Sequence, residues 1–99
     1  MLLDLNVTKS FLRVDFDDDD LLITMLIEAA ENYIYEATGK MFDSSNKLAQ
    51  LAALKIITLN YSERSGIIDK KSLIIPRFID SDLFKLKYSK GVSKDGQKN

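Results

Sequence analysis

Residues 15–39 read DFDDDDLLITMLIEAAENYIYEATG, and this stretch decides the fold. It opens with aspartates, continues through an apolar middle without proline and ends at Gly39. Asp17 or Asp18 is expected to cap a helix by accepting hydrogen bonds from its first free N–H groups, while Gly39 suits its left-handed end. Apolar residues recur at steps of three and four: Leu22, Met25, Leu26, Ala29, Ala30, Tyr33, Ile34 and Ala37. The stretch predicts one helix over 18–38, about 30 Å long, around which the rest of the chain packs.

A shorter helix is expected over residues 5–13, just before the acidic run. Asp4 is suited to cap it, and Val14 to Phe16 form a brief extended link to the long helix. A helix this short is not stable alone, so it must dock on the helix over 18–38. Its inward residues are expected to be Leu5, Thr8, Phe11 and Leu12.

A third helix is expected over residues 46–64, after a connection in which Phe42 contacts the core. Its N-cap is expected among Asp43, Ser44 and Ser45, and Gly66 ends it. One face carries Leu48, Leu51, Ala52, Ile56 and Leu59, and this face is widened by Ala49, Ala53, Ile57 and Tyr61. A helix with so much apolar surface is buried on more than one side, within its own domain or against another subunit.

The last part of the chain leaves alternatives open at two places. Residues 67–75 are either two short extended pieces around a turn or an irregular loop. Pro76 suits the first turn of a final helix over 76–87. The buried residues of that helix would be Phe78 or Ile79, Leu83 and Leu86. The alternative is that FKLKY, residues 84–88, forms a strand; a helix is favoured because the preceding residues 80–82 are poor strand formers.

These elements predict an all-α fold, a small bundle of three to four helices in one domain over residues 1–88. Residues 89–99 hold two glycines and little to bury, which predicts a flexible basic C-terminal tail. Hydrophobic residues at 45% and charged residues at 29% are ordinary values for a soluble globular protein. The start MLLDLN does not resemble a signal peptide, and the apolar runs are too short to span a membrane. A soluble, unexported protein is therefore expected.

The sequence gives no positive reason to assign an enzyme. It has no cysteine and no histidine, which removes disulfides, thiol nucleophiles, imidazole bases and every metal site built on these ligands. Gly-rich phosphate loops and nucleophile motifs are also absent from the sequence. Carboxylates such as Glu28 and Glu31 lie on the polar side of the long helix, where a solvated face explains them. We accordingly expect no catalytic residues, no cofactor and no bound metal.

The aspartate run resembles the start of a calcium-binding loop but fails its later positions. Such a loop needs glycine at its sixth position and a bidentate glutamate at its twelfth. Counted from Asp15, those positions are Asp20 and Leu26; counted from Asp17, Glu28 fits but Leu22 takes the place of glycine. Helix capping and a solvated acidic helix start are the better explanation.

Charge is divided unevenly between the two halves of the chain. Residues 1–50 hold four Lys/Arg and ten Asp/Glu, and residues 51–99 hold ten Lys/Arg and five Asp/Glu, for a net charge of −1. The division is either incidental or marks a subunit whose acidic face meets the basic face of a neighbour or partner. Lysines near the C-terminus, from Lys85 onward, could instead contact nucleic-acid phosphates without reading bases.

Three pieces of the chain resemble the head–tail connector proteins of tailed bacteriophages, also called adaptor, head-completion or DNA-packaging proteins. The first is residues 11–40, with a short helix ending in Leu-Arg, an acidic turn and a long helix closing on Thr-Gly. The second is KLAQLAALKIITLNYSER, an alanine-rich helix that ends with Tyr61 and Arg64. The third is IIPRFIDSDLFKLKY, a proline followed by a helix. Together the pieces span about residues 5–88, and their order and spacing carry the resemblance.

The resemblance implies a helical subunit of a phage or prophage particle that forms a ring of about a dozen copies, built from heterologous contacts. The ring would lie below the portal protein, extend the DNA channel without sequence-specific binding and give a docking platform for a tail-side stopper or tail-completion protein. The subunit would enter the virion at the head–tail interface from the bacterial host cytoplasm, with no membrane involved. The alternative is a small helical phage-derived regulatory or DNA-binding protein.

Within this role, acidic side chains between Asp17 and Glu36 are expected to face basic side chains from the second half of an adjacent subunit. Tyr61 and Arg64 are further candidates, because tyrosine and arginine are common interface anchors, although in a monomer they would simply close the helix against the core. The candidate contact residues are Asp17, Asp18, Asp19, Asp20, Glu28, Glu31, Glu36, Tyr61, Arg64, Lys85 and Lys87.

Overall fold

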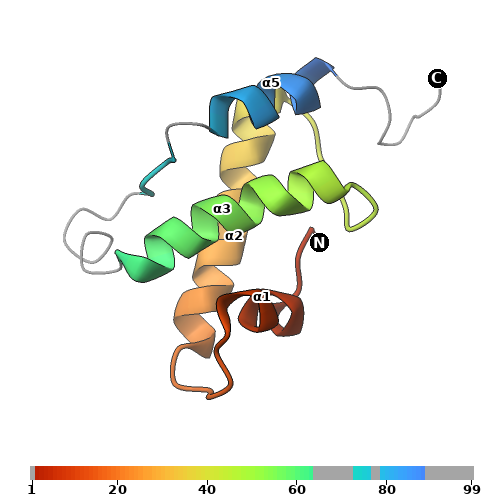
Figure 1. The fold of residues 1–99 in the computed structure, drawn as a ribbon. Helices are drawn as coiled ribbons and strands as arrows, with labels where there is room; N and C mark the ends of the chain where they lie inside the picture. The colour runs from red at the N-terminus through yellow and green to blue at the C-terminus, as the bar shows by residue number, and fades with distance from the viewer. Residues whose placement is uncertain (1, 64–72, 77–78, 89–99) are drawn as a thin grey trace.

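The computed structural model describes residues 2–63, 73–76 and 79–88. These residues form four helices and no strand, so the predicted all-α bundle is confirmed. Each helix begins and ends within three residues of its predicted bounds. The helices are α1 (Leu5–Leu12), α2 (Asp20–Thr38), α3 (Lys47–Ser62) and α5 (Ile79–Tyr88), as Figure 1 shows.

Helix α2 is the element on which the other three pack. It contacts α1, α3 and α5, whereas α1 and α5 do not contact each other. In Figure 1, α3 crosses in front of α2, the turn from α1 lies at the N-terminal end of α2, and α5 lies across its C-terminal end. Gly39 ends α2 as predicted, with φ at +75° and its N–H donating to the Tyr35 carbonyl at 2.7 Å. The long helix therefore organises the fold.

The predicted cap of α2 is wrong. The helix begins at Asp20, and its N-cap is Asp19, whose side chain makes no capping hydrogen bond. The Asp17 carbonyl accepts a hydrogen bond from the Asp20 N–H at 3.2 Å, so a turn occupies the positions where the cap was expected. The aspartate side chains are bound elsewhere, as described below.

The buried face of α2 is rotated from the predicted one. Met25 and Ala37 were expected inside and are exposed, whereas Ile23 and Ile27 are fully buried. Apolar residues cover so much of this helix that two overlapping stripes satisfy the same spacing, and packing against its neighbours selects one of them. The buried residues of α2 are Ile23, Leu26, Ile27, Ala30, Ile34 and Thr38.

Helix α1 begins at its predicted cap. The Asp4 carboxylate accepts a hydrogen bond from the Val7 N–H at 2.8 Å, and the buried Thr8 hydroxyl donates to the Asp4 carbonyl at 2.8 Å. Phe11, expected inside, is exposed, because α1 presents only one narrow face to α2 and α3. Arg13 ends the helix in the left-handed region, with φ at +65°.

Helix α3 begins one residue after a cap that differs from the predicted candidates. Asn46 accepts a hydrogen bond from the Ala49 N–H at 3.0 Å. Asp43 instead forms the preceding turn, where hydrogen bonds from the Ser45 hydroxyl and then from the Ser45 N–H lower the pKa of its carboxyl. The local side-chain bond to Ser45 thus competes with capping.

The wide apolar surface predicted for α3 is confirmed, except that Leu51 is exposed. Its buried residues are Ala49, Ala52, Ala53, Leu54, Ile56, Ile57 and Asn60. Phe42 packs against the core as expected. The helix ends at Ser62, and Gly66, predicted to end it, lies outside the described residues.

Helix α5 begins at Ile79 rather than at Pro76. The Pro76 carbonyl accepts a hydrogen bond from the Ile79 N–H at 3.2 Å, so the proline precedes the helix. Ile79, Leu83 and Leu86 are buried as predicted, and the strand alternative for residues 84–88 is wrong. An ion pair of 2.7 Å between Lys55 and the buried Asp82 joins α3 to α5. Phe78 lies outside the described residues.

Asn60 holds the segment before α5 against α3. Its Oδ1 accepts from the Ile74 N–H and its Nδ2 donates to the Ile74 carbonyl, both at 2.7 Å, and Nδ2 also donates to the Ile56 carbonyl at 2.7 Å. Asn60 is fully buried, and residues 73–76 form neither helix nor strand. The rest of the segment 67–75, whose conformation the sequence leaves open, and the predicted tail 89–99 lie outside the described residues.

Leu2 and Leu3 complete the core from the N-terminal side. The Leu2 N–H donates to Glu31 of α2, and the Leu2 carbonyl accepts from Gln50 of α3 at 3.0 Å. Within the described ranges, no helix is long and apolar enough to cross a membrane.

Candidate interaction surfaces

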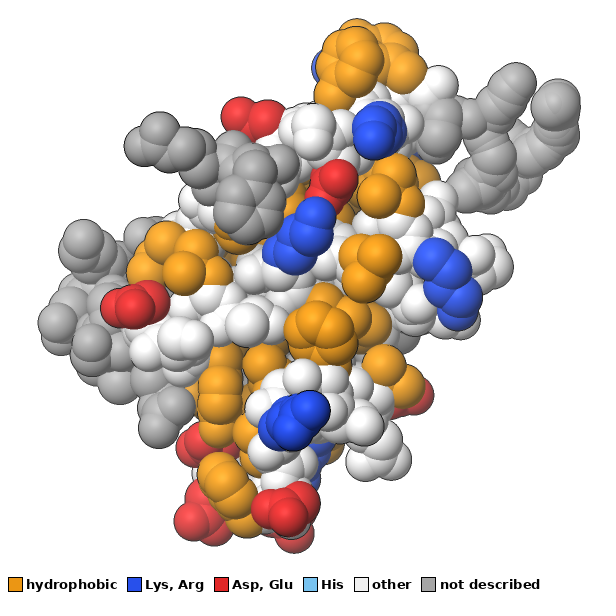
Figure 2. Space-filling model, in the orientation of Figure 1, with side chains coloured by type: hydrophobic (Ala, Val, Ile, Leu, Met, Phe, Trp, Pro, Cys, Tyr) orange, Lys and Arg blue, Asp and Glu red, His pale blue; other side chains and the backbone are white. Residues whose placement is uncertain are grey.

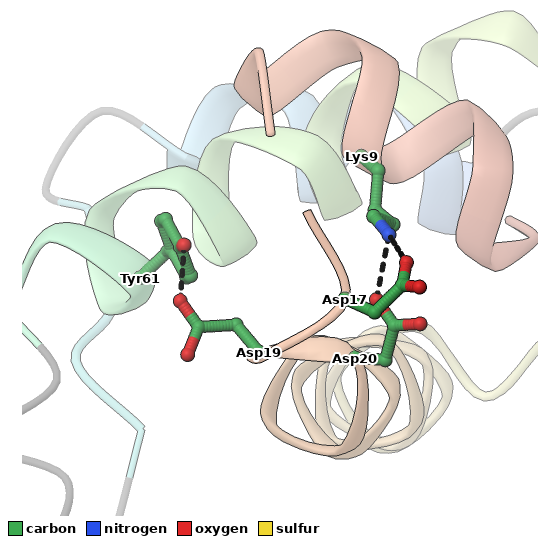
Figure 3. Close-up of polar contacts among 5 residues, drawn as sticks. All are labelled: Lys9, Asp17, Asp19, Asp20 and Tyr61. Carbon is green, nitrogen blue, oxygen red and sulfur yellow. Dashed lines mark hydrogen bonds and ion pairs between the residues drawn. The ribbon is translucent and has the colours of Figure 1, made fainter. Parts of the chain in front are cut away.

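The acidic turn before α2 is bound to two other helices of the same chain. Lys9 of α1 lies between two carboxylates, with its Nζ 3.0 Å from Asp17 Oδ1 and 2.7 Å from Asp20 Oδ1 (Figure 3). On the other side of the turn, the hydroxyl of Tyr61 from α3 donates to Asp19 Oδ2 at 2.5 Å. The turn therefore ties the start of α2 to both α1 and α3.

Lys9 is the cation that balances this turn. Its side chain is only 13% exposed, and its hydrogen bonds to Asp20 and then to Asp17 raise the pKa of its ammonium. A half-exposed carboxylate cluster would otherwise repel itself, so the ammonium stabilises the packing of α1 on α2. The sequence analysis missed Lys9. The sequence does carry a signal for this ion pair: Lys9 lies in the last turn of α1, and the five aspartates follow that helix directly.

The acidic run is arranged for an internal ammonium and not as a metal-ligand set. In the part of the chain that the structure describes, no group of three or more acidic side chains is arranged to hold a metal ion. Asp17 and Asp20 converge on the Lys9 Nζ, and Asp19 points away from them toward Tyr61 (Figure 3).

The remaining candidate contact residues lie on different elements and differ in exposure. Asp18, Glu28 and Glu36 are exposed, Asp18 in the turn and the two glutamates on α2. Glu31 is half-buried and accepts from the Leu2 N–H. Lys85 and Lys87 are exposed in the last turn of α5, and Arg64 lies outside the described residues. The structure thus places the exposed acids on the turn and α2, and the two lysines on α5.

Several large apolar side chains are exposed beside these charges, and the sequence did not indicate them. Phe16, Leu21 and Met25 are exposed around the start of α2. Phe84 and Tyr88 are exposed on α5, where their ring centroids lie 4.9 Å apart. Figure 2 shows hydrophobic side chains at both ends of the molecule, with acidic side chains gathered at the lower end. Neighbouring exposed apolar groups of this kind are candidate surfaces for contact with other proteins.

Comparison with family models matches residues 3–75 to a family described as phage gp6-like head-tail connector protein. The matched range contains α1, α2 and α3 in full and ends at the segment that precedes α5. No curated protein and no solved structure matches the chain. Because the match covers well over half of the 99 residues, and the helices within it follow the order expected from the resemblance, the chain belongs to the family of phage gp6-like head–tail connector proteins.

Proposed function

We propose that this protein is the subunit of a ring that lies below the portal of a phage or prophage head. The ring extends the DNA channel and provides the docking platform for a tail-side stopper or tail-completion protein. The observation that carries the proposal is the family match across α1, α2 and α3, which gives the chain a structural role in connecting phage head and tail. A ring of about a dozen copies requires heterologous contacts between unlike surfaces of neighbouring subunits.

The charge distribution supports assembly more than DNA binding. Exposed acids on the turn and α2 give one surface a negative potential, which repels phosphates and attracts basic side chains of a neighbour. The basic side chains of α5 are Lys85 and Lys87, and they lie beside two exposed aromatic rings, which suits a protein surface more than a row of phosphates. Double-stranded DNA passing through the channel is then guided without sequence-specific contacts.

The same role places the protein at the head–tail interface of the virion after synthesis in the host cytoplasm. Catalytic residues are not required, because the contribution of a connector is shape and surface. Among the candidate contacts, Asp18, Glu28 and Glu36 are the acids whose exposure suits a partner. Asp17, Asp19 and Asp20 act by holding the turn in place through Lys9 and Tyr61.

Deletion of the gene from the phage or prophage that encodes it tests the proposal. Particle production should then yield portal-containing heads and free tails that do not join, and wild-type protein supplied in trans should restore complete particles. Complete infectious particles from the deletion strain would contradict the role. A change in the timing of phage gene expression, with normal particles, would instead favour the regulatory alternative.

A further inference from the structure

We propose that an aromatic patch on α5 of one subunit packs on an apolar patch at the start of α2 of the next copy. The α5 patch consists of Phe84 and Tyr88 with Lys85 and Lys87 beside them. The α2 patch consists of Phe16, Leu21 and Met25 with Asp15 and Asp18 beside them. This inference rests on the proposed function, since it identifies the surfaces through which copies of the chain assemble.

The α2 patch is an apolar surface without a covering element among the described residues. Leu21 is 74% exposed, and Met25 lies one turn further along the same face of the helix. Phe16 is exposed in the turn that leads into the helix. Asp15 and Asp18 are exposed in that same turn, so the apolar residues have negative charge beside them.

The α5 patch is an ordered aromatic pair. Phe84 and Tyr88 are 65% and 67% exposed, and the interplanar angle of their rings is 55°. The Lys87 ammonium lies 5.7 Å from the centroid of the Tyr88 ring, within the range of a cation–π contact. Since the rings already pack on each other, little side-chain freedom remains to be lost when a partner covers them.

The charges of the two patches are complementary. Asp82 is paired with Lys55, and Asp80 lies a full turn before Phe84, so the positive charge of α5 is concentrated at its C-terminal end. Contact between copies of one patch would bring like charges together, whereas contact between the α2 patch and the α5 patch brings aspartates to lysines. The favoured occupant of each patch is therefore the other patch, on a second copy.

The two patches lie too far apart to meet within one subunit. Helix α2 has 19 residues and is therefore about 28 Å long, and α5 lies across the end opposite the turn (Figure 1). In Figure 2 most of the acidic side chains lie at the lower end, whereas hydrophobic side chains lie at the upper end with both basic and acidic side chains near them. Contacts between unlike ends are heterologous, so they continue from copy to copy and give a ring when the rotation closes.

Cross-linking of single-cysteine variants tests this pairing, because the chain has no native cysteine. Asn32→Cys lies two turns beyond Met25 on the same helix face as the α2 patch, and Ser81→Cys lies one turn before Phe84 on α5. Both positions are exposed, so the substitutions leave the core and both patches intact. The two full-length variants, one with a size tag, are mixed at high concentration and treated with a short bismaleimide.

The proposal predicts cross-linked pairs that contain one copy of each variant, with at least tenfold less product from either variant alone. Phe84→Ser added to the α5 variant should lower the yield several-fold. Ser44→Cys, an exposed position in the connection between α2 and α3, should cross-link poorly to both variants and serves as the control. Equal yields from single variants, or no product above this control, would overturn the pairing.

Charge reversal gives an independent measurement. Asp15→Lys with Asp18→Lys added to the α2 cysteine variant, or Lys85→Glu with Lys87→Glu added to the α5 cysteine variant, should abolish cross-linking to the unreversed partner variant. Mixing the two reversed variants should restore it. Failure of restoration would overturn the pairing. Binding of each variant to purified portal protein is measured in parallel. Cross-linking without portal binding would support the pairing and count against the connector role. Portal binding without cross-linking would support the connector role and overturn the pairing.

Discussion

Asn60 shows how one buried polar side chain can determine the position of an element. Two of its hydrogen bonds join α3 to Ile74, and through that segment they position α5; the third, to the Ile56 carbonyl, lies within α3. Periodicity places Asn60 on the apolar face of α3, four residues after Ile56 and seven after Ala53, but it does not identify the hydrogen-bond partner of a buried amide. Asn60 becomes a buried hydrogen-bond partner of Ile74 because the segment 73–76 packs against α3.

Substitution of Asn60 should be strongly destabilising. Asn60→Ala leaves the Ile74 N–H and carbonyl without their partner, and we expect a loss of roughly 2–4 kcal/mol in the free energy of unfolding, measured by urea denaturation. Asn60→Asp keeps the shape but replaces the Nδ2 donor, and should cost at least as much. Asn32→Ala, at an exposed position of α2, is the control and should change stability by less than about 0.5 kcal/mol. A loss from Asn60→Ala no larger than that of the control would contradict this role.

Arg13 is the opposite case, a residue whose backbone matters more than its side chain. It ends α1 with φ at +65°, in the left-handed region where a Cβ is crowded. Arg13→Gly should raise the free energy of unfolding by about 0.5–1 kcal/mol, whereas Arg13→Ala should leave it nearly unchanged. Thermal or urea unfolding measures both, and a destabilised glycine variant would show that the guanidinium makes an essential contact.

At the scale of elements, the cluster of Lys9, Asp17 and Asp20 couples the packing of α1 on α2 to pH. The carboxylates raise the pKa of Lys9 in the folded protein above its ordinary 10.5. The charged form therefore stabilises the fold at lower pH, and this contribution is lost as the pH rises through the raised pKa.

Comparison of wild type with Lys9→Met tests this coupling. Wild type should be the more stable at neutral pH, and its advantage should shrink as the pH rises above about 10.5. Lys9→Arg should keep its stability relative to Lys9→Met over the same range, because a guanidinium stays charged. Urea unfolding at a series of pH values measures the differences. An advantage of wild type that does not change with pH would contradict the account.

The helices could be predicted from the sequence because their local signals agree. Asp4 caps α1 and Gly39 ends α2. The unbroken apolar pattern between the acidic run and Gly39 predicts the long helix. The caps of α2 and α3 could not be predicted in the same way, because several adjacent aspartates or serines offer the same hydrogen bond. Competing partners decide among them: Asp19 is bound to Tyr61 of another helix, and Asp43 is bound locally to Ser45.

The candidate surfaces could be predicted only in part, for a related reason. Charge counting identified the acidic and basic halves, but it does not distinguish Asp17, which pairs with Lys9, from the exposed Asp18. The apolar patches were missed because Leu21, Met25 and Phe84 occur at helical spacings that suit a core equally well. Their exposure follows from how the four described helices pack.

At the scale of the whole molecule, the fold presents unlike surfaces at opposite ends of α2. The acidic turn and the α2 patch lie at one end, and the α5 patch lies across the other. This polarity suits a subunit that meets copies of itself by heterologous contacts, as the proposed ring requires. The chain belongs to a phage head–tail connector family.

The most direct test of the connector role is electron cryomicroscopy of the purified protein mixed with the portal protein of the phage that encodes it. The account predicts a ring of helical subunits bound to the tail-side face of the portal, continuing its channel. Short duplex DNA at physiological salt serves as the competing ligand and should bind weakly. Portal particles without added density, together with tight binding of the duplex, would contradict the account.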